Sequence, residues 1–270
     1  MAASARMRCG VRPRRAEPVS AVSAEVAVSP RPSLDGGGRG PEPLVEVERV
    51  TQRFGRVTAL QEVSLTIRRG ELVFVTGPSE AGKTTLLRLL HGELRPSQGS
   101  VRVDGFQLGR RWRWFLPRLR RRVGAVFQDH RLLPDLTAQG NVAFALQATD
   151  LWLPPGEVAA RARARLEEVG LGGRAGAFPG QLSGGQQRRL AIARALALEP
   201  VLLLADEPTA NLDRGNAERV LELLERRWRA GTTVVIATHD RELARSRGAR
   251  TVELREGRVV ADRPTVEEAG

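Results

Sequence analysis

Several residue types are scarce in this chain of 270 residues, and each scarcity excludes a class of protein. There is one cysteine, Cys9, so an internal disulfide framework is excluded and the chain suits a reducing compartment. No apolar run approaches the roughly 18 residues that a membrane span needs. Hydrophobic residues make up 41% of the chain and charged residues 27%, which is typical of a globular protein and unlike a disordered or collagen-like chain.

Lysine is equally scarce, because 42 of the 43 basic residues are arginine and Lys83 is the single lysine. Such a bias usually reflects genome composition, so the net charge of +12 does not by itself indicate nucleic-acid binding. A basic surface favours anionic partners of any kind, including phospholipid headgroups. A position that keeps lysine against this bias needs an ammonium group rather than a guanidinium group.

The composition divides the chain into three parts. Residues 1–43 are rich in Ala, Arg, Pro, Ser and Gly, so we expect them to be disordered. They are an inert tail, an organelle-targeting peptide or a tether to an anionic surface. We expect one folded domain over 44–262, with a helical lobe at about 130–182, and a short tail at 263–270.

The folded part alternates predicted strands with predicted helices. Alternating or continuous apolar runs predict strands, which cover 44–50, 63–67, 71–77, 100–105, 201–205, 232–238 and a hairpin over 251–260. Helical spacing follows from Thr84 and recurs over 137–180, 186–198 and 218–229, with a break at Pro154–Gly156. This order predicts an α/β fold with a largely parallel sheet and an attached helical lobe.

A phosphate-binding loop is predicted between a strand and a helix. Residues 77–84 fit G-x-x-x-x-G-K-[ST], a pattern that arises by chance about once in a hundred chains of this length. The candidate binding residues are Gly77, Pro78, Ser79, Glu80, Ala81, Gly82, Lys83, Thr84 and the adjoining Thr85. Backbone N–H groups would surround phosphate oxygens, Lys83 would reach the β- and γ-phosphates, and Thr84 would ligate Mg²⁺. The alternative is a glycine turn with an incidental lysine.

A second motif, LSGGQ at 182–186, precedes a long predicted helix. Ser183 stands where a helix N-cap is expected, and Gly184 and Gly185 allow close backbone approach to an anion. A plain helix cap is the alternative interpretation.

Polar side chains end two of the buried strands. Asp206 and Glu207 close one strand, and burying adjacent acids is costly unless a cation or water uses them. We expect Asp206 to bind Mg²⁺ and Glu207 to be the base that polarises an attacking water. A further strand, parallel to this one, ends at His239 and would bring an imidazole to the same edge of the sheet. The alternative is that His239 is a structural histidine. Gln128 follows the apolar run VGAVF and suits contact with Mg²⁺ and water.

Taken in order, these motifs, with NLD at 211–213 and ATHD at 237–240, resemble the ATP-binding cassette (ABC) family over roughly residues 44–261. The resemblance implies a P-loop NTPase fold: a mostly parallel core sheet, an antiparallel β subdomain and a helical signature subdomain. It also implies an ATPase that uses ATP and Mg²⁺. The catalytic residues it implies are Glu207, His239 and Gln128, and the metal ligands are Thr84, Gln128 and Asp206.

The resemblance further implies a head-to-tail homodimer, in which each ATP lies between the phosphate loop of one copy and the LSGGQ motif of the other. Ser183 and Gly185, flanked by Gly184 and Gln186, would then act in trans on the γ-phosphate. Asp213 would belong to the loop that couples the two sites. Phe54 matches the aromatic that stacks on adenine. No specific nucleic-acid partner is implied.

Glu80 departs from the family pattern, which usually has glycine at that position. An inward carboxylate would repel the triphosphate, whereas an outward one would lie in solvent, and we favour the outward orientation. The departure puts turnover in question more than binding.

Residues 115–146 and the Phe-Pro before QLSGG resemble the bacterial cell-division branch of the family. This implies a peripheral protein on the cytoplasmic face of the inner membrane that acts with an integral membrane subunit of the FtsX type. Lipoprotein-release and macrolide-export ATPases share most of the motifs. A chromosome-maintenance ATPase is disfavoured because only about a hundred residues, without heptads, separate Lys83 from Ser183. A non-hydrolysing ATP-binding scaffold stays open because of Glu80.

Residues 109–122 hold seven arginines with Trp112, Trp114 and Phe115. The segment is a solvated basic face, a nucleobase-stacking surface, or a surface that meets inner-leaflet anionic lipid or the membrane partner. We favour the last. Charge reversal at Arg120–Arg122 is then expected to abolish membrane association.

Overall fold

The computed structural model describes residues 42–109, 114–148 and 153–265, and it confirms the predicted α/β fold with two β-sheets and a set of helices. Residues 1–41, most of the expected disordered extension, lie outside the described residues, as do Trp112 and the end of the expected tail. The expected domain boundaries at 43/44 and 262/263 stay predictions; the first strand begins at Pro43, which pairs with Arg68, and the last ends at Arg263, which pairs with Thr251.

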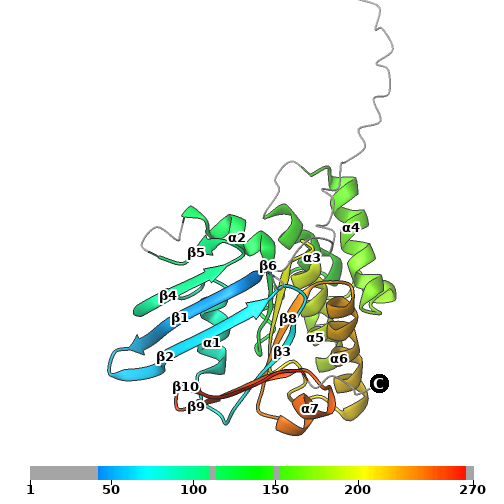
Figure 1. Ribbon diagram of the computed structural model, residues 1–270. Helices are drawn as coiled ribbons and strands as arrows, with labels where there is room; N and C mark the ends of the chain where they lie inside the picture. The colour runs from blue at the N-terminus through cyan, green and yellow to red at the C-terminus, as the bar shows by residue number, and fades with distance from the viewer. Residues whose placement is uncertain (1–41, 110–113, 149–152, 266–270) are drawn as a thin grey trace, which may run out of the picture. The chain divides into compact units, whose positions relative to one another are not determined.

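The larger sheet has the strand order β10-β9-β3-β8-β7-β6 (Figure 1). Its strands are β3 (Leu72–Thr76), β6 (Val123–Val126), β7 (Leu202–Asp206), β8 (Thr233–Thr238), β9 (Arg250–Arg255) and β10 (Arg258–Arg263). The pairings from β9 across to β6 are parallel, and β10 is antiparallel at one edge. The parallel strands therefore end at one edge of the sheet, where ligands bind in open α/β folds.

This sheet is buried on both faces, as the near-continuous apolar runs of β3, β7 and β8 predict. Alternate residues belong to two separate cores: Val73 and Val75 face one of them, and Leu72 and Phe74 face the other. The sheet therefore forms the rigid centre from which the polar residues at the strand ends project.

The smaller sheet is antiparallel, with the order β2-β1-β4-β5. Its strands are β1 (Pro43–Phe54), β2 (Val57–Arg68), β4 (Gln98–Val103) and β5 (Phe106–Gln107). Helix α1 (Lys83–Leu90) shares one apolar core with both sheets and buries Leu86, Leu87, Leu89 and Leu90 there. The first turn of α1 is thereby fixed against the larger sheet. Helix α2 (Leu116–Arg122) leads from the small sheet into β6.

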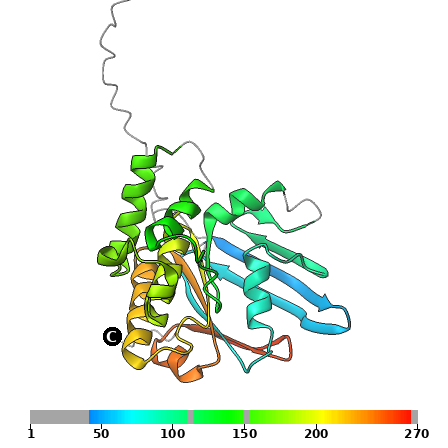
Figure 2. The ribbon, with the colours of Figure 1, turned by 180° about the vertical axis from the view of Figure 1, so that it is seen from behind.

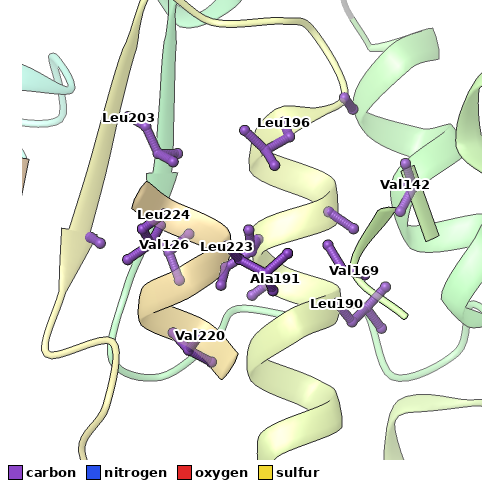
Figure 3. Close-up of a cluster of buried hydrophobic side chains, with 14 of the residues drawn as sticks. Val126, Val142, Val169, Leu190, Ala191, Leu196, Leu203, Val220, Leu223 and Leu224 are labelled. Atoms are coloured by element: carbon purple, nitrogen blue, oxygen red, sulfur yellow. The ribbon is translucent and has the colours of Figure 1, made fainter. Parts of the chain in front are cut away.

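The other face of the larger sheet shares a second apolar core with the remaining helices (Figures 1 and 2). They are α3 (Ala138–Gln147), α4 (Pro155–Glu168), η2 (Gly172–Arg174), η3 (Pro179–Gln181), α5 (Gly184–Leu196), α6 (Arg214–Arg229) and α7 (Arg241–Ser246). Of these, α5 and α6 pack directly on strands of the sheet. Figure 3 shows how α5 joins them: Leu190 lies toward Val142 and Val169 of the helical lobe, and Ala191 lies toward Leu223 of α6. None of the helices in the described ranges has the length and apolar character needed to cross a membrane.

Candidate nucleotide-hydrolysis site

The phosphate loop, residues 77–84, runs from the end of β3 to the first turn of α1, and two glycines allow it to pass between neighbouring strands. Gly77 has φ 151° and Gly82 has φ 100°. A Cβ atom would lie 2.2 Å from the Leu254 carbonyl oxygen at Gly77 and 2.5 Å from the Ala59 carbonyl oxygen at Gly82. Both contacts are to backbone that cannot yield, so these positions require glycine.

Lys83 is held inside this loop, with only 7% of the residue exposed. Its Nζ donates hydrogen bonds to the carbonyl oxygens of Gly77 (2.8 Å) and Pro78 (2.9 Å) and lies 3.8 Å from Glu207 Oε1. A compact ammonium with three donors suits these partners, whereas a planar guanidinium is wider. This geometry gives a physical reason for the single lysine of the chain.

Glu80 lies at the tip of the loop, where it and Pro78 and Ser79 are exposed. Its backbone is left-handed, with φ 65°. The exposure agrees with the outward orientation expected from the sequence.

Asp206 ends β7 almost completely buried, with 2% exposed. The Oδ1 atom of Asp206 is buried without a hydrogen-bond partner among the described residues. Burial raises the pKa of Asp206 above its ordinary value; the Glu207 charge acts in the same direction, and Thr84 and Lys83 act against it. The unpartnered oxygen fits a cation or a water held by one.

Glu207 lies between groups from two other elements. Its backbone is left-handed, with φ 47°, and its N–H donates to the Ala237 carbonyl at 2.9 Å. His239 Nδ1 donates to Glu207 Oε2 at 3.0 Å, and the side chains of the two residues are 65% and 14% exposed respectively. Neighbouring parallel strands therefore bring a carboxylate and an imidazole together, as the sequence predicted, with Lys83 on the other carboxylate oxygen.

Gln128 is exposed just after β6 and lines a cavity of about 390 Å³. Its lining residues are Thr84, Arg88, Phe127, Gln128, Asp129, Asp206 and Asn211. The three residues expected to bind Mg²⁺, namely Thr84, Gln128 and Asp206, thus share one cavity. No cluster of three or more His, Cys, Asp or Glu suited to a metal occurs in the described part of the chain. Mg²⁺ commonly takes one or two carboxylates and completes its shell with water and phosphate oxygens, so this donor set fits it.

Four lining residues were missed from the sequence, namely the apolar Phe127 and three polar residues for which signals exist. Arg88 follows Thr84 by one helical turn, so the two share a face of α1. Asp129 adjoins Gln128, and Asn211 begins the NLD run.

The signature turn, Ser183–Gln186, forms a capping box at the start of α5. Ser183 Oγ accepts a hydrogen bond from Gln186 N (3.3 Å), and Gln186 Oε1 accepts one from Ser183 N (2.9 Å). Ser183 and Gly184 are exposed, whereas Gly185 is buried against Asn216, whose Cγ would lie 2.8 Å from an added Cβ. The turn is therefore a helix cap that also leaves exposed N-terminal backbone.

Asp213 caps α6 and is joined to the signature turn through Asn216. Its Oδ1 accepts from Asn216 N (2.9 Å) and its Oδ2 from Asn216 Nδ2 (2.5 Å). These bonds hold the pKa of Asp213 below its ordinary value.

The other expected residues lie away from the cavity. Phe54 ends β1 with 46% exposed, and Thr85 is partly buried in α1. Neither of them lines the Gln128 cavity, nor do Ser183 and Asp213.

The basic segment is described from Trp114 onward. Trp114 is 83% exposed, and Arg118, Arg120 and Arg121 are exposed on α2. Arg122 differs from them because its Nε lies 2.6 Å from Asp104, which also pairs with Arg69. The charge of Arg122 is therefore paired within the fold, although 46% of its side chain is exposed like those of the other three arginines.

A parallel sheet whose strand ends bring a phosphate-loop lysine, an aspartate and a glutamate–histidine pair together is typical of an ATP-hydrolysing cassette with a separate helical lobe. The comparison with protein families agrees, because residues 60–210 match the ABC transporter model. The chain belongs to the ATP-binding cassette family, whose members bind and hydrolyse ATP.

Its relatives include cell-division proteins. It is 43% identical to the cell division ATP-binding protein FtsE of Mycobacterium tuberculosis over 228 residues, which cover 81% of this chain and 95% of that one. It is also 45% identical to the macrolide export ATP-binding/permease protein MacB 1/2 of Paracoccus denitrificans, covering 83% of this chain but 34% of that protein.

Among solved structures, the chain resembles a dimeric ATP-binding cassette, MJ0796, in a post-hydrolysis state bound to ADP and Pi. The TM-score is 0.75 and the identity 36%, over 82% of this chain and 98% of that one. The solved relative is thus dimeric and holds the hydrolysis products.

Proposed function

We propose that this chain is a Mg²⁺-dependent ATP hydrolase that acts as the motor subunit of a membrane complex in cell division. The observation that carries the hydrolase is the meeting of Lys83, Asp206, Glu207 and His239 at one sheet edge. The FtsE-named relatives, at 39–43% identity, support the cell-division role.

In this mechanism the phosphate loop binds the triphosphate with its backbone N–H groups and Lys83. Thr84 and Asp206 would hold Mg²⁺ with Gln128 nearby, and the ion would supply positive charge that stabilises the phosphates during hydrolysis. Glu207 polarises the attacking water and takes its proton on a carboxylate oxygen. His239, which donates to Glu207 Oε2, keeps that carboxylate oriented and contacts the γ-phosphate side. Phe54 stacks on adenine.

We propose that two copies close head to tail, so that Ser183, Gly184 and Gly185 of one copy contact the γ-phosphate held by the other. The exposed N-terminus of α5 suits this contact, because free N–H groups and the helix dipole attract phosphate. The contact from Asp213 to Gly185 through Asn216 would link the two sites.

The partner that we propose is an integral membrane subunit of the FtsX type, which holds the chain at the cytoplasmic face of the inner membrane. A groove of about 480 Å³ beside Gln128 offers a docking place for it, because the groove is lined by Phe127 and by Phe144, which is 52% exposed. The exposed arginines of α2 would lie near anionic lipid.

A transport role is the second candidate. The 45% identity to a macrolide export protein favours it. The two roles differ in the membrane subunit, so a pull-down of the full chain from native membranes with mass-spectrometric identification separates them.

The hydrolase is tested on the purified full chain. Wild-type protein should release phosphate from ATP with Mg²⁺ and lose this activity in excess chelator. Lys83→Ala should lose ATP binding. Glu207→Gln should bind ATP, turn over at least about a hundredfold more slowly, and accumulate an ATP-bound dimer in size-exclusion chromatography. Normal turnover by Glu207→Gln would refute the assignment of the base.

A further inference from the structure

Helix α5 holds both ends of the Gln128 loop, which we define as Phe127–Arg131. At one end, Arg188 Nη1 donates to the Phe127 carbonyl at 3.2 Å. At the other, Arg194 donates to the His130 carbonyl at 2.7 Å and to the Arg131 carbonyl. The two arginines are six residues apart, or about 9 Å along the helix, so α5 contacts the loop at both of its ends.

The loop itself is stiff. His130 and Arg131 have left-handed backbones, with φ 55° and 48°, which non-glycine residues adopt only when neighbouring contacts hold them. The guanidinium of Arg131 stacks on the Phe127 ring at 3.9 Å from the centroid. Because the loop is stiff, we expect a movement of Arg188 or Arg194 to displace Gln128 as well.

Arg188 has a second set of neighbours at the hydrolytic site. It is only 2% exposed, and its Nε is buried without a hydrogen-bond partner among the described residues. Burial lowers its pKa, and the charges of Asp206 and Glu207 act in the opposite direction. One buried cation is thus hydrogen-bonded to the Gln128 loop and interacts electrostatically with the carboxylates at the end of β7. Burying the Arg188 guanidinium is costly, so packing alone does not account for an arginine at this position.

We propose that Arg188 is a positioning residue that couples the signature turn of each copy to the hydrolytic site of that same copy. This inference rests on the proposed head-to-tail dimer. Ser183 is five residues before Arg188, about 7.5 Å along α5, so contact of the signature turn with the partner copy's nucleotide displaces both. Arg188 then carries the displacement to Gln128 and to the carboxylates, so that hydrolysis in one copy depends on nucleotide in the other.

The test compares Arg188→Met with Arg189→Met in the full-length chain. Arg189 is the matched control because it is the adjacent arginine of α5, but it donates to the carbonyls of Val169 and Gly170 in the helical lobe. Arg188→Gln is the second variant, should Arg188→Met fold poorly, because it retains a donor for Phe127 but no charge. ATP dependence of turnover, nucleotide affinity of the monomer and thermal melting are measured for each.

We expect Arg188→Met and Arg188→Gln to bind ATP within twofold of wild type. Their Hill coefficient for ATP should fall to about 1 from a value approaching 2, and kcat should fall about tenfold. Arg189→Met should retain the wild-type Hill coefficient. Wild-type cooperativity in a folded Arg188 variant, or an equal loss in Arg189→Met, overturns the inference alone. A Glu207→Gln chain that stays monomeric with Mg²⁺ and ATP overturns the proposed dimer, and this inference with it.

Discussion

At the scale of single residues, burying the carboxylate of Asp206 lowers the stability of the nucleotide-free chain. Burial raises the pKa of this carboxyl, so its folded-state pKa lies above the ordinary value of 3.8. Its contribution to stability is present at low pH and is lost as the pH rises through that raised pKa. Near neutral pH, the ionised form therefore destabilises the folded chain in the absence of a cation.

We predict that Asp206→Asn stabilises the nucleotide-free chain at pH 7.5 by about 1 kcal/mol, which raises the melting temperature by about 2–4 °C. The variant should lose the further stabilisation that Mg²⁺ and ATP give to wild type, because the carboxylate ligand is gone. Differential scanning fluorimetry with and without Mg²⁺ and ATP measures both effects.

Asp213→Asn is the matched control for that substitution. The pKa of Asp213 is lowered by its bonds to Asn216, so the ionised form is the favoured one and the same substitution should not raise the melting temperature. A nucleotide-free Asp206→Asn chain that melts below wild type would contradict the claim that burial of this carboxylate destabilises the folded chain.

At the scale of elements, the Gln128 loop is tied to the end of α1 as well as to α5. Glu93 follows α1 and pairs with Arg131, and His91 Nδ1 lies 3.5 Å from its carboxylate. These partners, His91 foremost, lower the pKa of Glu93 from 4.5 to about 2 although burial acts against them. A lowered pKa gives stability that is present above pH 4.5 and is lost as the pH falls toward 2.

We predict that Glu93→Gln lowers the free energy of unfolding by about 1 kcal/mol at pH 7, after allowance for solvent screening. The difference from wild type should shrink below pH 4.5, where the wild-type carboxylate begins to lose its advantage. Urea unfolding between pH 7 and pH 3 measures it. Glu167→Gln, in an exposed pair with Arg163, serves as the control and should change stability by only a few tenths of a kcal/mol. If Glu93→Gln lowers the free energy of unfolding by the same amount at pH 3 as at pH 7, the lowered pKa of Glu93 is not the cause of the loss.

Sequence patterns predicted the long elements and missed the short ones, for identifiable reasons. The strands β3, β7 and β8 are buried on both faces and therefore stand out as apolar runs. Strand β6 has four residues, and Gly124 weakens its pattern; a Cβ there would lie 2.5 Å from the Ala195 carbonyl oxygen of α5. Helix α2 buries only Leu119 among its seven residues, so it has no apolar stripe to recognise.

The same distinction holds within the site. The phosphate loop and the signature turn are contiguous, so their residues could be identified from spacing alone. Arg188 could not, because its significance comes from contacts with Phe127 and β7 that are remote in sequence. From the sequence alone, Arg188 is one of two adjacent arginines of α5, and nothing distinguishes it until the fold shows that it is buried.

At the scale of the whole molecule, the groove beside the Gln128 loop connects the hydrolytic site to a surface. It is lined by Phe127, Arg131 and Arg194 of the loop and its clamp, and by the exposed Phe144 of α3. A helix of a membrane subunit that seats there contacts groups that move with Gln128. Under the proposed function, hydrolysis and movement of the partner would then be coupled through this one loop.

We predict that Phe144→Asp abolishes co-purification of the membrane subunit from native membranes, while ATP turnover of the isolated chain changes less than about twofold. A charge in the groove opposes burial of an apolar partner surface, and Phe144 does not line the Gln128 cavity. Val260→Asp on β10 is the matched control, since both side chains are 52% exposed, and it should retain the partner. If Phe144→Asp still recovers the subunit at wild-type yield, the partner docks elsewhere and the groove does not couple it to Gln128.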